Sequence, residues 1–238
     1  RAVNIEFGEH LTEFDVLRSS KAEEILGDTQ SVQQMMHVKL CLPGLHNVKN
    51  ALAAIAVADE LQIGDDAVIS ALEKFEGIDR RFQNLGDVPM KSGTVTIVDD
   101  YGHHPTEVAA TLAAAKAAYP TRRVVLAFQP HRYTRTRDLM DDFATVLSEA
   151  DVTIVLDVYA AGEDPIAGAD GRAITRATRT RGSIEPVFVE SLDDLQPVLE
   201  SVLADGDLVL LMGAGDIGAY AAGLPELLAT KPNLKVHS

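Results

Sequence analysis

The chain has 238 residues, of which 46% are hydrophobic and 24% charged, a composition typical of a globular protein that can bury a core. Its 36 acidic residues outnumber its 21 basic residues, and the net charge of −15 argues against nucleic acid or an anionic membrane surface as the main partner. Because the single cysteine cannot form an internal disulfide and no apolar run reaches the roughly 18 residues of a membrane span, we expect a cytoplasmic protein.

The first part of the chain is predicted to contain strands followed by helices. Three segments with apolar or alternating patterns are predicted strands: 2–7, 13–18 and 32–42. After a Pro-Gly breaker, two helical patterns follow: 46–64 and 65–75. Because the chain begins at Arg1 inside an alternating pattern, we interpret residues 1–78 as the end of a larger α/β domain.

From residue 79 onward, predicted strands and helices alternate. The strands are expected at 94–98, 123–128, 152–156, 186–189 and 207–212. The helices are expected at 105–119, 136–149, 170–181, 191–204 and 216–229. This alternation favours right-handed β-α-β units, and the continuous Val, Ile and Leu runs indicate strands covered on both faces. Residues 79–238 are therefore predicted to form a Rossmann-like three-layer α/β domain with a mostly parallel sheet.

A cluster of polar side chains follows the predicted strand 94–98. It contains two carboxylates, a phenol and two imidazoles: Asp99, Asp100, Tyr101, His103 and His104. Pro105 suits the first position of the next helix, and Glu107 suits its first turn because a negative charge opposes the helix dipole. Ligands bind at the carboxyl ends of strands in open α/β sheets, so this segment is predicted to form a binding site.

A second polar cluster follows the next predicted strand, 123–128. It holds three arginines within six residues: Arg132, Arg135 and Arg137. The planar guanidinium groups of Arg132 and Arg135 can clamp a carboxylate, which arginine does better than lysine. A solvated turn is the alternative. Two successive strands would place polar clusters on the same edge of the sheet, which favours the binding interpretation.

Two further segments carry candidate ligand-binding residues. His46 and Asn50 lie four residues apart on one helix face, where a carboxamide can pair with the edge of adenine and an imidazole can stack on the base. Asn47 lies beside them, and its alternative role is that of a helix cap. Arg80 and Arg81 lie at the predicted domain junction, where an arginine either reaches a phosphate or is simply solvated.

The segment Gly213–Gly218 matches G-x-G-x-x-G between a predicted strand and helix. The dinucleotide fingerprint also needs a following strand and an acidic residue about 20 positions on, for which no room remains. A tight turn between closely packed backbones is favoured, with a stand-alone dinucleotide-binding domain or a non-catalytic acidic interaction domain as alternatives. The adjacent His103 and His104, without a cysteine or an H-x-x-x-H pair, argue against a structural zinc site.

Taken together, five segments closely resemble the Mur ligases. They are Leu42–Ala51, Arg80–Gln83, Asp99–Glu107, Phe128–Arg137 and Gly213–Gly218. The resemblance covers essentially the whole chain in order. The runs His-His-Pro-Thr-Glu and His-Arg-Tyr-Thr-Arg-Thr-Arg resemble the branch of the family that joins L-alanine to UDP-N-acetylmuramate. One departure is Asp216, where asparagine is also common in the family.

The resemblance implies an ATP-dependent ligase of peptidoglycan precursor synthesis. In such a ligase ATP converts the muramate carboxylate into an acyl phosphate, which the amine of L-alanine attacks. The family's phosphate loop follows G-x-x-x-x-G-K-[ST], and no Gly-Lys pair occurs here. That loop, the UDP-sugar domain and the main Mg²⁺ ligands are expected upstream of Arg1, so we expect this chain alone to be inactive. Strand edges left unpaired would promote association into oligomers.

The resemblance also implies roles for domains and residues. Residues 1–78 would be the C-terminal part of the central ATP-binding domain, and residues 79–238 the Rossmann-like domain that receives the amino acid. The residues matching nucleotide contacts are His46, Asn47 and Asn50 for adenine, Arg81 for the phosphates and Asp100 for the ribose. The residues matching the surroundings of the incoming alanine are Tyr101, His103, Arg132 and Arg135, with the two arginines holding its carboxylate.

Overall fold

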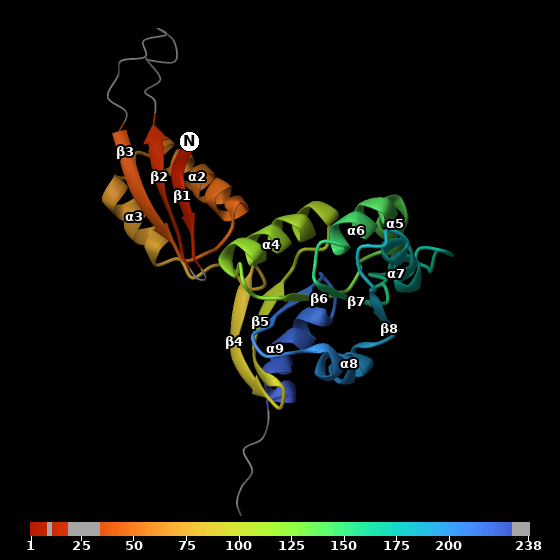
Figure 1. The fold of residues 1–238 in the computed structure, drawn as a ribbon. Helices are drawn as coiled ribbons and strands as arrows, with labels where there is room; N and C mark the ends of the chain where they lie inside the picture. Colours follow the sequence, from red (N-terminus) through yellow and green to blue (C-terminus); the bar gives the residue numbers. More distant parts are fainter. Residues whose placement is uncertain (9–10, 19–33, 230–238) are drawn as a thin grey trace, which may run out of the picture. The chain divides into compact units, whose positions relative to one another are not determined.

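The computed structural model describes residues 1–8, 11–18 and 34–229 (Figure 1). Positions 32 and 33 of the third predicted strand lie outside these ranges. Contacts divide the chain into two compact units. The first unit comprises Arg1–Gly77 and Ala113–Pro120, and the second comprises Ile78–Leu112 and Thr121–Ser238.

The first unit contains a three-stranded antiparallel sheet and two helices. The strands are β1 (Ala2–Phe7), β2 (Thr12–Arg18) and β3 (Gln34–Leu40), in the order β1-β2-β3. The helices are α2 (Leu45–Glu60) and α3 (Asp65–Glu73). Alternate residues such as Phe14 and Val38 are fully buried, and they form one core with Val48, Ile55 and Val68 of the helices. The predicted order of strands followed by helices is confirmed.

The second unit is built on a six-stranded sheet. Its strands are β4 (Gln83–Met90), β5 (Gly93–Asp100), β6 (Val124–Phe128), β7 (Val152–Leu156), β8 (Val187–Val189) and β9 (Leu208–Met212). The order is β4-β5-β9-β6-β7-β8. Neighbouring strands are parallel except for the antiparallel pair β4–β5. The predicted mostly parallel sheet is therefore confirmed.

Helices cover both faces of this sheet, as the three-layer prediction requires. They are α4 (Pro105–Ala118), α5 (Tyr133–Asp138), α6 (Met140–Leu147), α7 (Gly171–Thr180), α8 (Leu195–Val202) and α9 (Ile217–Leu228), with a 3₁₀ turn η1 (Leu192–Asp194). In Figure 1, α4, α6 and α7 lie on one side of the strands and α8 and α9 on the other. Successive residues of each strand point to opposite faces of the sheet. Ile154 packs with Leu195 and Leu224, while the rings of Phe128 and Phe143 are 5.4 Å apart on the opposite side.

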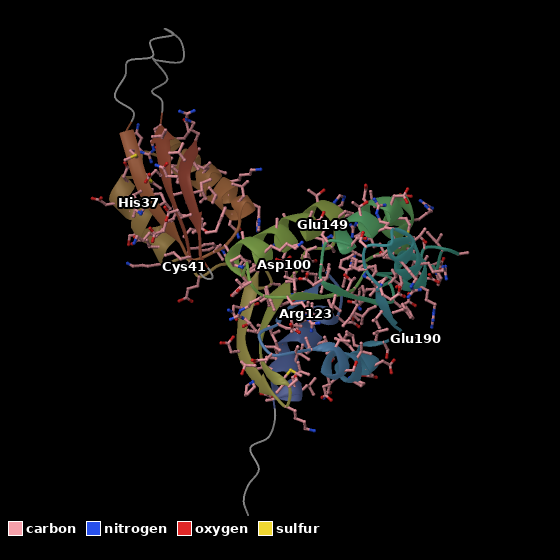
Figure 2. The ribbon with its side chains drawn as sticks, in the orientation of Figure 1. His37, Cys41, Asp100, Arg123, Glu149 and Glu190 are labelled. Atoms are coloured by element: carbon pink, nitrogen blue, oxygen red, sulfur yellow. The ribbon has the colours of Figure 1, made fainter. Side chains whose placement is uncertain are left out.

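An ion pair between the exposed Arg123 and the buried Asp207 joins the amino ends of two parallel strands, β6 and β9. Arg123, labelled in Figure 2, precedes β6. Its Nε and Nη2 donate to the two carboxylate oxygens of Asp207 at 2.9 and 2.6 Å. Asp207, which precedes β9, is 2% exposed. The bidentate geometry holds the two strands in register from this end. The polar loops described below lie at the opposite end of the sheet.

Within the described ranges, none of the helices has the length and apolar character needed to cross a bilayer.

Two elements differ from the predictions. Strand β4 is absent from the predicted strands, because Gly86 and Pro89 disfavour a strand and only Val88 of the segment is buried. As an antiparallel edge strand it tolerates both residues, with an irregularity in register between Asn84 and Gly86. The single helix predicted over 136–149 is wrong. The helix α5 begins three residues earlier, at Tyr133, and ends at Asp138, and a separate helix α6 begins at Met140 after a break at Leu139, whose φ is −119°.

Helix α9 contains a buried phenol that gives a first testable prediction. The hydroxyl of Tyr220 is buried and finds no hydrogen-bond partner in the described part of the chain. Burial, with Asp193 and Glu200 nearby, raises the pKa of Tyr220 to about 12. A buried donor without a partner destabilises the folded state, so Tyr220→Phe is expected to leave stability unchanged or to raise it by about 1 kcal/mol at pH 7.

The raised pKa adds a pH dependence to this prediction. A phenol with a raised pKa in the folded state contributes stability fully below its ordinary pKa of 10.0, and that contribution is lost as the pH rises toward about 12. The stability advantage of Tyr220→Phe should therefore grow between pH 7 and pH 11. Urea unfolding of both proteins at the two pH values measures it, and a clear loss of stability in the variant at pH 7 would contradict the prediction.

Candidate ligand-binding site

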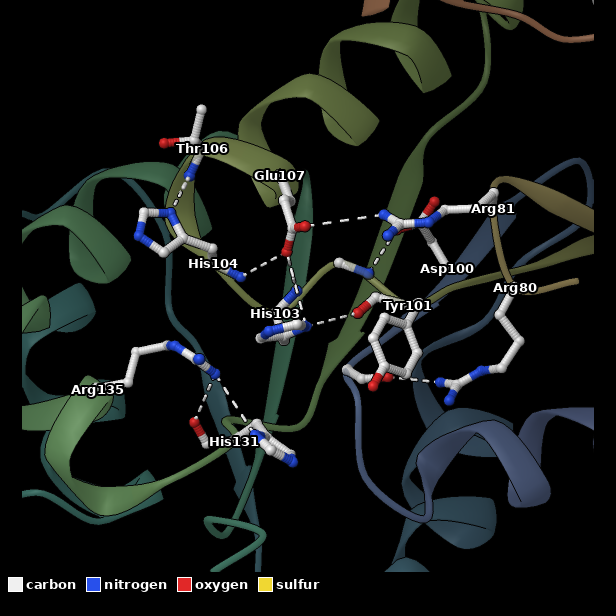
Figure 3. Close-up of polar contacts among 12 residues, drawn as sticks. Arg80, Arg81, Asp100, Tyr101, His103, His104, Thr106, Glu107, His131 and Arg135 are labelled. Atoms are coloured by element: carbon white, nitrogen blue, oxygen red, sulfur yellow. Dashed lines mark hydrogen bonds and ion pairs between the residues drawn. The ribbon is translucent and has the colours of Figure 1, made fainter. Parts of the chain in front are cut away.

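Parallel pairing brings the carboxyl ends of four strands to one edge of the second unit. The strands β5, β9, β6 and β7 are successive neighbours, so their last residues, Asp100, Met212, Phe128 and Leu156, end on the same side. We call this side the carboxyl edge. The polar segments predicted after β5 and β6 therefore lie beside one another (Figure 3).

Asp100 organises the loop that follows β5. Its carboxylate is 3% exposed and accepts hydrogen bonds from the backbone N–H groups of Phe82 at 2.8 Å and Gly102 at 2.7 Å. Burial raises the pKa of Asp100, against the lowering effect of these two donors and of Arg81. Each carboxylate oxygen has two lone pairs. Asp100 therefore has a structural role in the loop, with lone pairs left on each oxygen.

Glu107 fixes the entry into α4. Its Oε2 accepts from the backbone N–H groups of His103 at 3.0 Å and His104 at 3.1 Å, which is the glutamate half of a capping box. Its Oε1 lies 3.8 Å from Nη1 of Arg81. Burial raises the pKa of Glu107, but the hydrogen bonds and the nearby His103 and Arg81 outweigh it, and the pKa is lowered overall. The sequence predicts only the dipole role and gives no sign of the ion pair with Arg81.

Four aromatic rings form a row along the carboxyl edge. Tyr101 meets His103 edge-on with centroids 5.3 Å apart, and His103 lies 5.5 Å from His131. His131 stacks on Tyr159 at 5.5 Å with an interplanar angle of 12°. A parallel β-bridge between His131 and Tyr159 supports this stack. The row joins the loops after β5, β6 and β7, whereas the sequence favours only Tyr101 and His103 as site residues.

The two imidazoles have different hydrogen-bonding roles. Nδ1 of His103 is 3.0 Å from the carbonyl oxygen of Tyr101, which only accepts, so Nδ1 carries a proton and donates. Nδ1 of His131 is 3.4 Å from Nη1 of Arg135, which only donates, so Nδ1 accepts and Nε2 carries the proton. Burial, followed by His103 and the two arginines Arg132 and Arg135, lowers the pKa of His131. His131 is therefore neutral at pH 7.

The two predicted arginines lie next to this row. Nη1 of Arg135 donates to the carbonyl oxygen of His131 at 3.1 Å. Nη1 of Arg132 lies 3.6 Å from Oε1 of Glu163 and its side chain is 49% exposed, so much of its guanidinium remains open to a ligand. Glu163 also accepts from Thr134 N and Oγ1 at 3.0 and 2.7 Å, and the hydrogen bonds from Thr134 lower its pKa. The sequence places Tyr159 and Glu163 in a polar segment after the predicted strand 152–156, for which lining the same crevice and forming a plain loop are equally favoured interpretations. The structure brings both residues to the carboxyl edge.

The glycine turn lies at the same edge and is closely packed. A Cβ on Gly213 would lie 2.7 Å from the carbonyl oxygen of Gln129, and a Cβ on Gly215 would meet the side chains of Gln129 and Tyr159. Gln129 also donates to Asp216 at 2.5 Å and accepts from Ile217 N at 3.1 Å. These contacts favour the tight-turn interpretation. They oppose a dinucleotide site, because a pyrophosphate needs open access to the glycines.

The remaining predicted residues lie in the first unit, at the start of α2. The cap position is occupied by Gly44, so the alternative that Asn47 is the helix cap is wrong. Asn47 is buried, and its Nδ2 donates to the carbonyl oxygen of Pro43 at 2.8 Å. His46 is partly buried and Asn50 is exposed one turn further on.

The second unit is a three-layer α/β domain whose titratable and aromatic groups gather at the carboxyl edge. This arrangement places it in the Rossmann-like class of ligand-binding domains. The family model described as Mur ligase, glutamate ligase domain, matches residues 80–215. The chain belongs to the Mur ligase family, and the resemblance inferred from its motifs is confirmed.

Individual relatives agree with this assignment. The chain is 57% identical over 213 residues to the UDP-N-acetylmuramate–L-alanine ligase of Azoarcus sp. (strain BH72), covering 89% of this chain and 44% of the relative. It is 54% identical over 192 residues to the ligase of the same name from Nitrosomonas europaea, covering 80% of this chain and 41% of the relative. The crystal structure of UDP-N-acetylmuramate-alanine ligase from Thermotoga maritima matches with a TM-score of 0.73 and 30% identity, covering 95% of this chain and 44% of that one. The chain thus spans less than half the length of these relatives.

Proposed function

We propose that this chain is the part of a UDP-N-acetylmuramate–L-alanine ligase that receives L-alanine, preceded by the C-terminal part of the ATP-binding domain. The observation that carries the proposal is the pair Arg132 and Arg135 beside the neutral ring of His131 at the carboxyl edge. Two guanidinium groups beside an uncharged imidazole suit a small carboxylate. The identity with relatives that carry this ligase name supports L-alanine as the amino acid.

The mechanism assigns binding and proton transfer to separate residues of the second unit. Arg132 and Arg135 hold the carboxylate of L-alanine, with Tyr101 and the ring row bounding its methyl group. His103 has its Nδ1–H committed to the carbonyl of Tyr101, so its Nε2 is the acceptor for a proton of the alanine ammonium. The neutral amine attacks the muramyl acyl phosphate formed with ATP. The tetrahedral intermediate then expels phosphate and leaves the amide.

Residues 1–78 and the start of the second unit are assigned to ATP. His46, Asn47 and Asn50 contact adenine, Arg81 reaches the phosphates and Asp100 accepts from the ribose. The exposed side chain of Arg81 supports its role toward the phosphates. Among the described residues, no group of three His, Cys, Asp or Glu side chains could hold a metal ion.

We further propose that this chain does not complete the reaction by itself. It spans 44% of the Azoarcus ligase, and its sequence contains no Gly-Lys pair and therefore no phosphate loop of the G-x-x-x-x-G-K-[ST] type. The test mixes the chain with a separately expressed half that carries the phosphate loop and the UDP-sugar domain. Phosphate release that depends on ATP, Mg²⁺, UDP-N-acetylmuramate and L-alanine is expected from the mixture and from neither half alone.

Two outcomes would contradict these proposals. Turnover by this chain alone would refute its incompleteness. If the intact protein fails to release phosphate with L-alanine but binds a nicotinamide dinucleotide, detected by nicotinamide fluorescence, the ligase assignment is wrong and the dinucleotide alternative is favoured.

A further inference from the structure

We propose that Arg80 is a positioning residue for the amino-acid site, which holds Tyr101 and the glycine turn Gly213–Gly218 in place without itself contacting substrate. This inference rests on the proposed function, because its kinetic readout is the use of L-alanine. It gives a role to the G-x-G-x-x-G segment, which the ligase mechanism leaves unexplained.

Arg80 joins three separate parts of the carboxyl edge. Its Nε donates to Oδ2 of Asp99 at 3.0 Å, and its Nη2 donates to the carbonyl oxygen of Gly213 at 2.5 Å. Its guanidinium carbon lies 5.0 Å from the centroid of the Tyr101 ring (Figure 3). The carbonyl oxygen of Arg80 also accepts from the backbone N–H of Tyr101 at 2.6 Å. One side chain therefore links the end of β5, the turn after β9 and an exposed ring of the site.

The third glycine of the motif provides the space that Arg80 occupies. A Cβ added at Gly218 would fall on the guanidinium group, against its Cζ, Nε and Nη2 atoms. Because Nε and Nη2 donate to Asp99 and Gly213, the guanidinium group cannot move aside without breaking a hydrogen bond. The requirement for glycine at position 218 follows from the packing of an arginine, with no need for a bound pyrophosphate.

The contacts of Arg80 are those of a largely buried side chain held in one conformation. Asp99 has a side chain 4% exposed, and burial raises its pKa while the hydrogen bond and charge of Arg80 lower it. Arg80 itself is 23% exposed and has a φ of 61°, a left-handed conformation that is unfavourable for a residue with a Cβ. Such strain persists where the surroundings impose it, and it clusters at binding sites. It also turns Arg80 inward while Arg81 points to Glu107.

Tyr101 is the group through which Arg80 would act. The ring is 38% exposed, so little packing from the core fixes it. Its described ring contacts are Arg80, Arg81 at 5.7 Å and the edge of His103 at 5.3 Å. Lysine can supply a cation near the ring, but its single nitrogen cannot occupy the two separate positions from which Nε and Nη2 of Arg80 donate to Asp99 and Gly213. Arg80→Lys should therefore behave as a disruptive change.

The experiment measures steady-state kinetics of the intact ligase with two variants that disturb the same contact from opposite sides, Arg80→Lys and Gly218→Ala. Both are expected to raise the KM for L-alanine by roughly tenfold, because neither variant holds a cation fixed against the Tyr101 ring and one partly desolvated cation–π contact is worth about that much. The kcat and the KM for ATP should change less than about twofold. Arg176→Ala, on the exposed face of α7, is the matched control and should leave all three constants unchanged.

A second readout does not depend on catalysis. In protein labelled with 3-fluorotyrosine, the fluorine resonance of Tyr101, assigned with Tyr101→Phe, should shift in Arg80→Lys and Gly218→Ala and stay in place in Arg176→Ala. An unchanged KM for L-alanine in both variants overturns the proposal, as does an unmoved resonance. If the wild-type protein does not use L-alanine, the proposed function fails, and the resonance alone decides whether Arg80 positions Tyr101.

Discussion

In the intact ligase proposed above, replacement of Arg132 by alanine is expected to raise the KM for L-alanine by roughly 10- to 150-fold, the effect of losing about 1.5–3 kcal/mol of hydrogen bonding to a charged group. The guanidinium of Arg132 is 49% exposed, with Glu163 at 3.6 Å as its described ion-pair partner, so it is accessible to a ligand. Glu163 keeps its two bonds from Thr134 when Arg132 is lost, so the loop after β7 should stay in place. Alanine also tolerates the φ of 75° at this position no worse than arginine does.

The same helix offers a matched control for this prediction. Arg137 pairs with the adjacent Asp138 at 2.8 Å, and its side chain is 55% exposed. Arg137→Ala removes the same charge from the α5 region but should leave the KM for L-alanine within about twofold, as expected for an exposed ion pair. Equal effects of the two substitutions would mean that the net charge of this region, and not a specific carboxylate contact, controls L-alanine binding. Initial rates of phosphate release at varied L-alanine concentration provide the measurement.

Much of the second unit was predictable because its strands carry their own pattern. The buried run Val124–Phe128 differs by one residue from the predicted strand 123–128, since continuous apolar residues mark a strand covered on both faces. Strand β4 was missed because Gly86 and Pro89 are unfavourable in central strands, and only the antiparallel edge position makes them acceptable. Where the local preference of residues such as Gly86 and Pro89 conflicts with their position in the sheet, the position determines whether a strand forms.

The candidate site was predictable in its location but not in its pairings. Strand ends indicated that Tyr101, His103 and Arg132 would lie on one edge, because parallel strands share a direction. The contact of Arg80 with Gly213 joins residues 133 positions apart. Which of the two arginines, Arg80 or Arg81, has its side chain directed toward Gly213 depends on the left-handed φ of Arg80. Neither a long-range contact nor a strained backbone angle has a local sequence pattern.

The second large expected effect is a loss of stability on substitution in the glycine turn. Gly213→Ala is expected to destabilise the second unit by about 2–6 kcal/mol, because two unfavourable terms act together. Gly213 has a φ of 151°, which residues with a Cβ rarely adopt, and the new Cβ would lie 2.7 Å from the carbonyl oxygen of Gln129. That oxygen belongs to the backbone directly after β6, which pairs with β9, so it cannot move aside as a side chain would.

Gly206→Ala separates the two terms, because Gly206 also has a positive φ, of 82°, but no atom within 4 Å of the position that a Cβ would take. Its substitution should cost about 1–2 kcal/mol from backbone strain alone. Urea unfolding followed by circular dichroism compares both variants with the wild type. If Gly213→Ala is no more destabilising than Gly206→Ala, close packing does not explain why position 213 is glycine.

A larger loss of stability in Gly213→Ala means that Gly213 leaves space between two strand ends, in the same way that Gly218 leaves space for Arg80. The glycines of the motif would then be a requirement of packing at the carboxyl edge, on which the positions of Tyr101 and Arg132 depend.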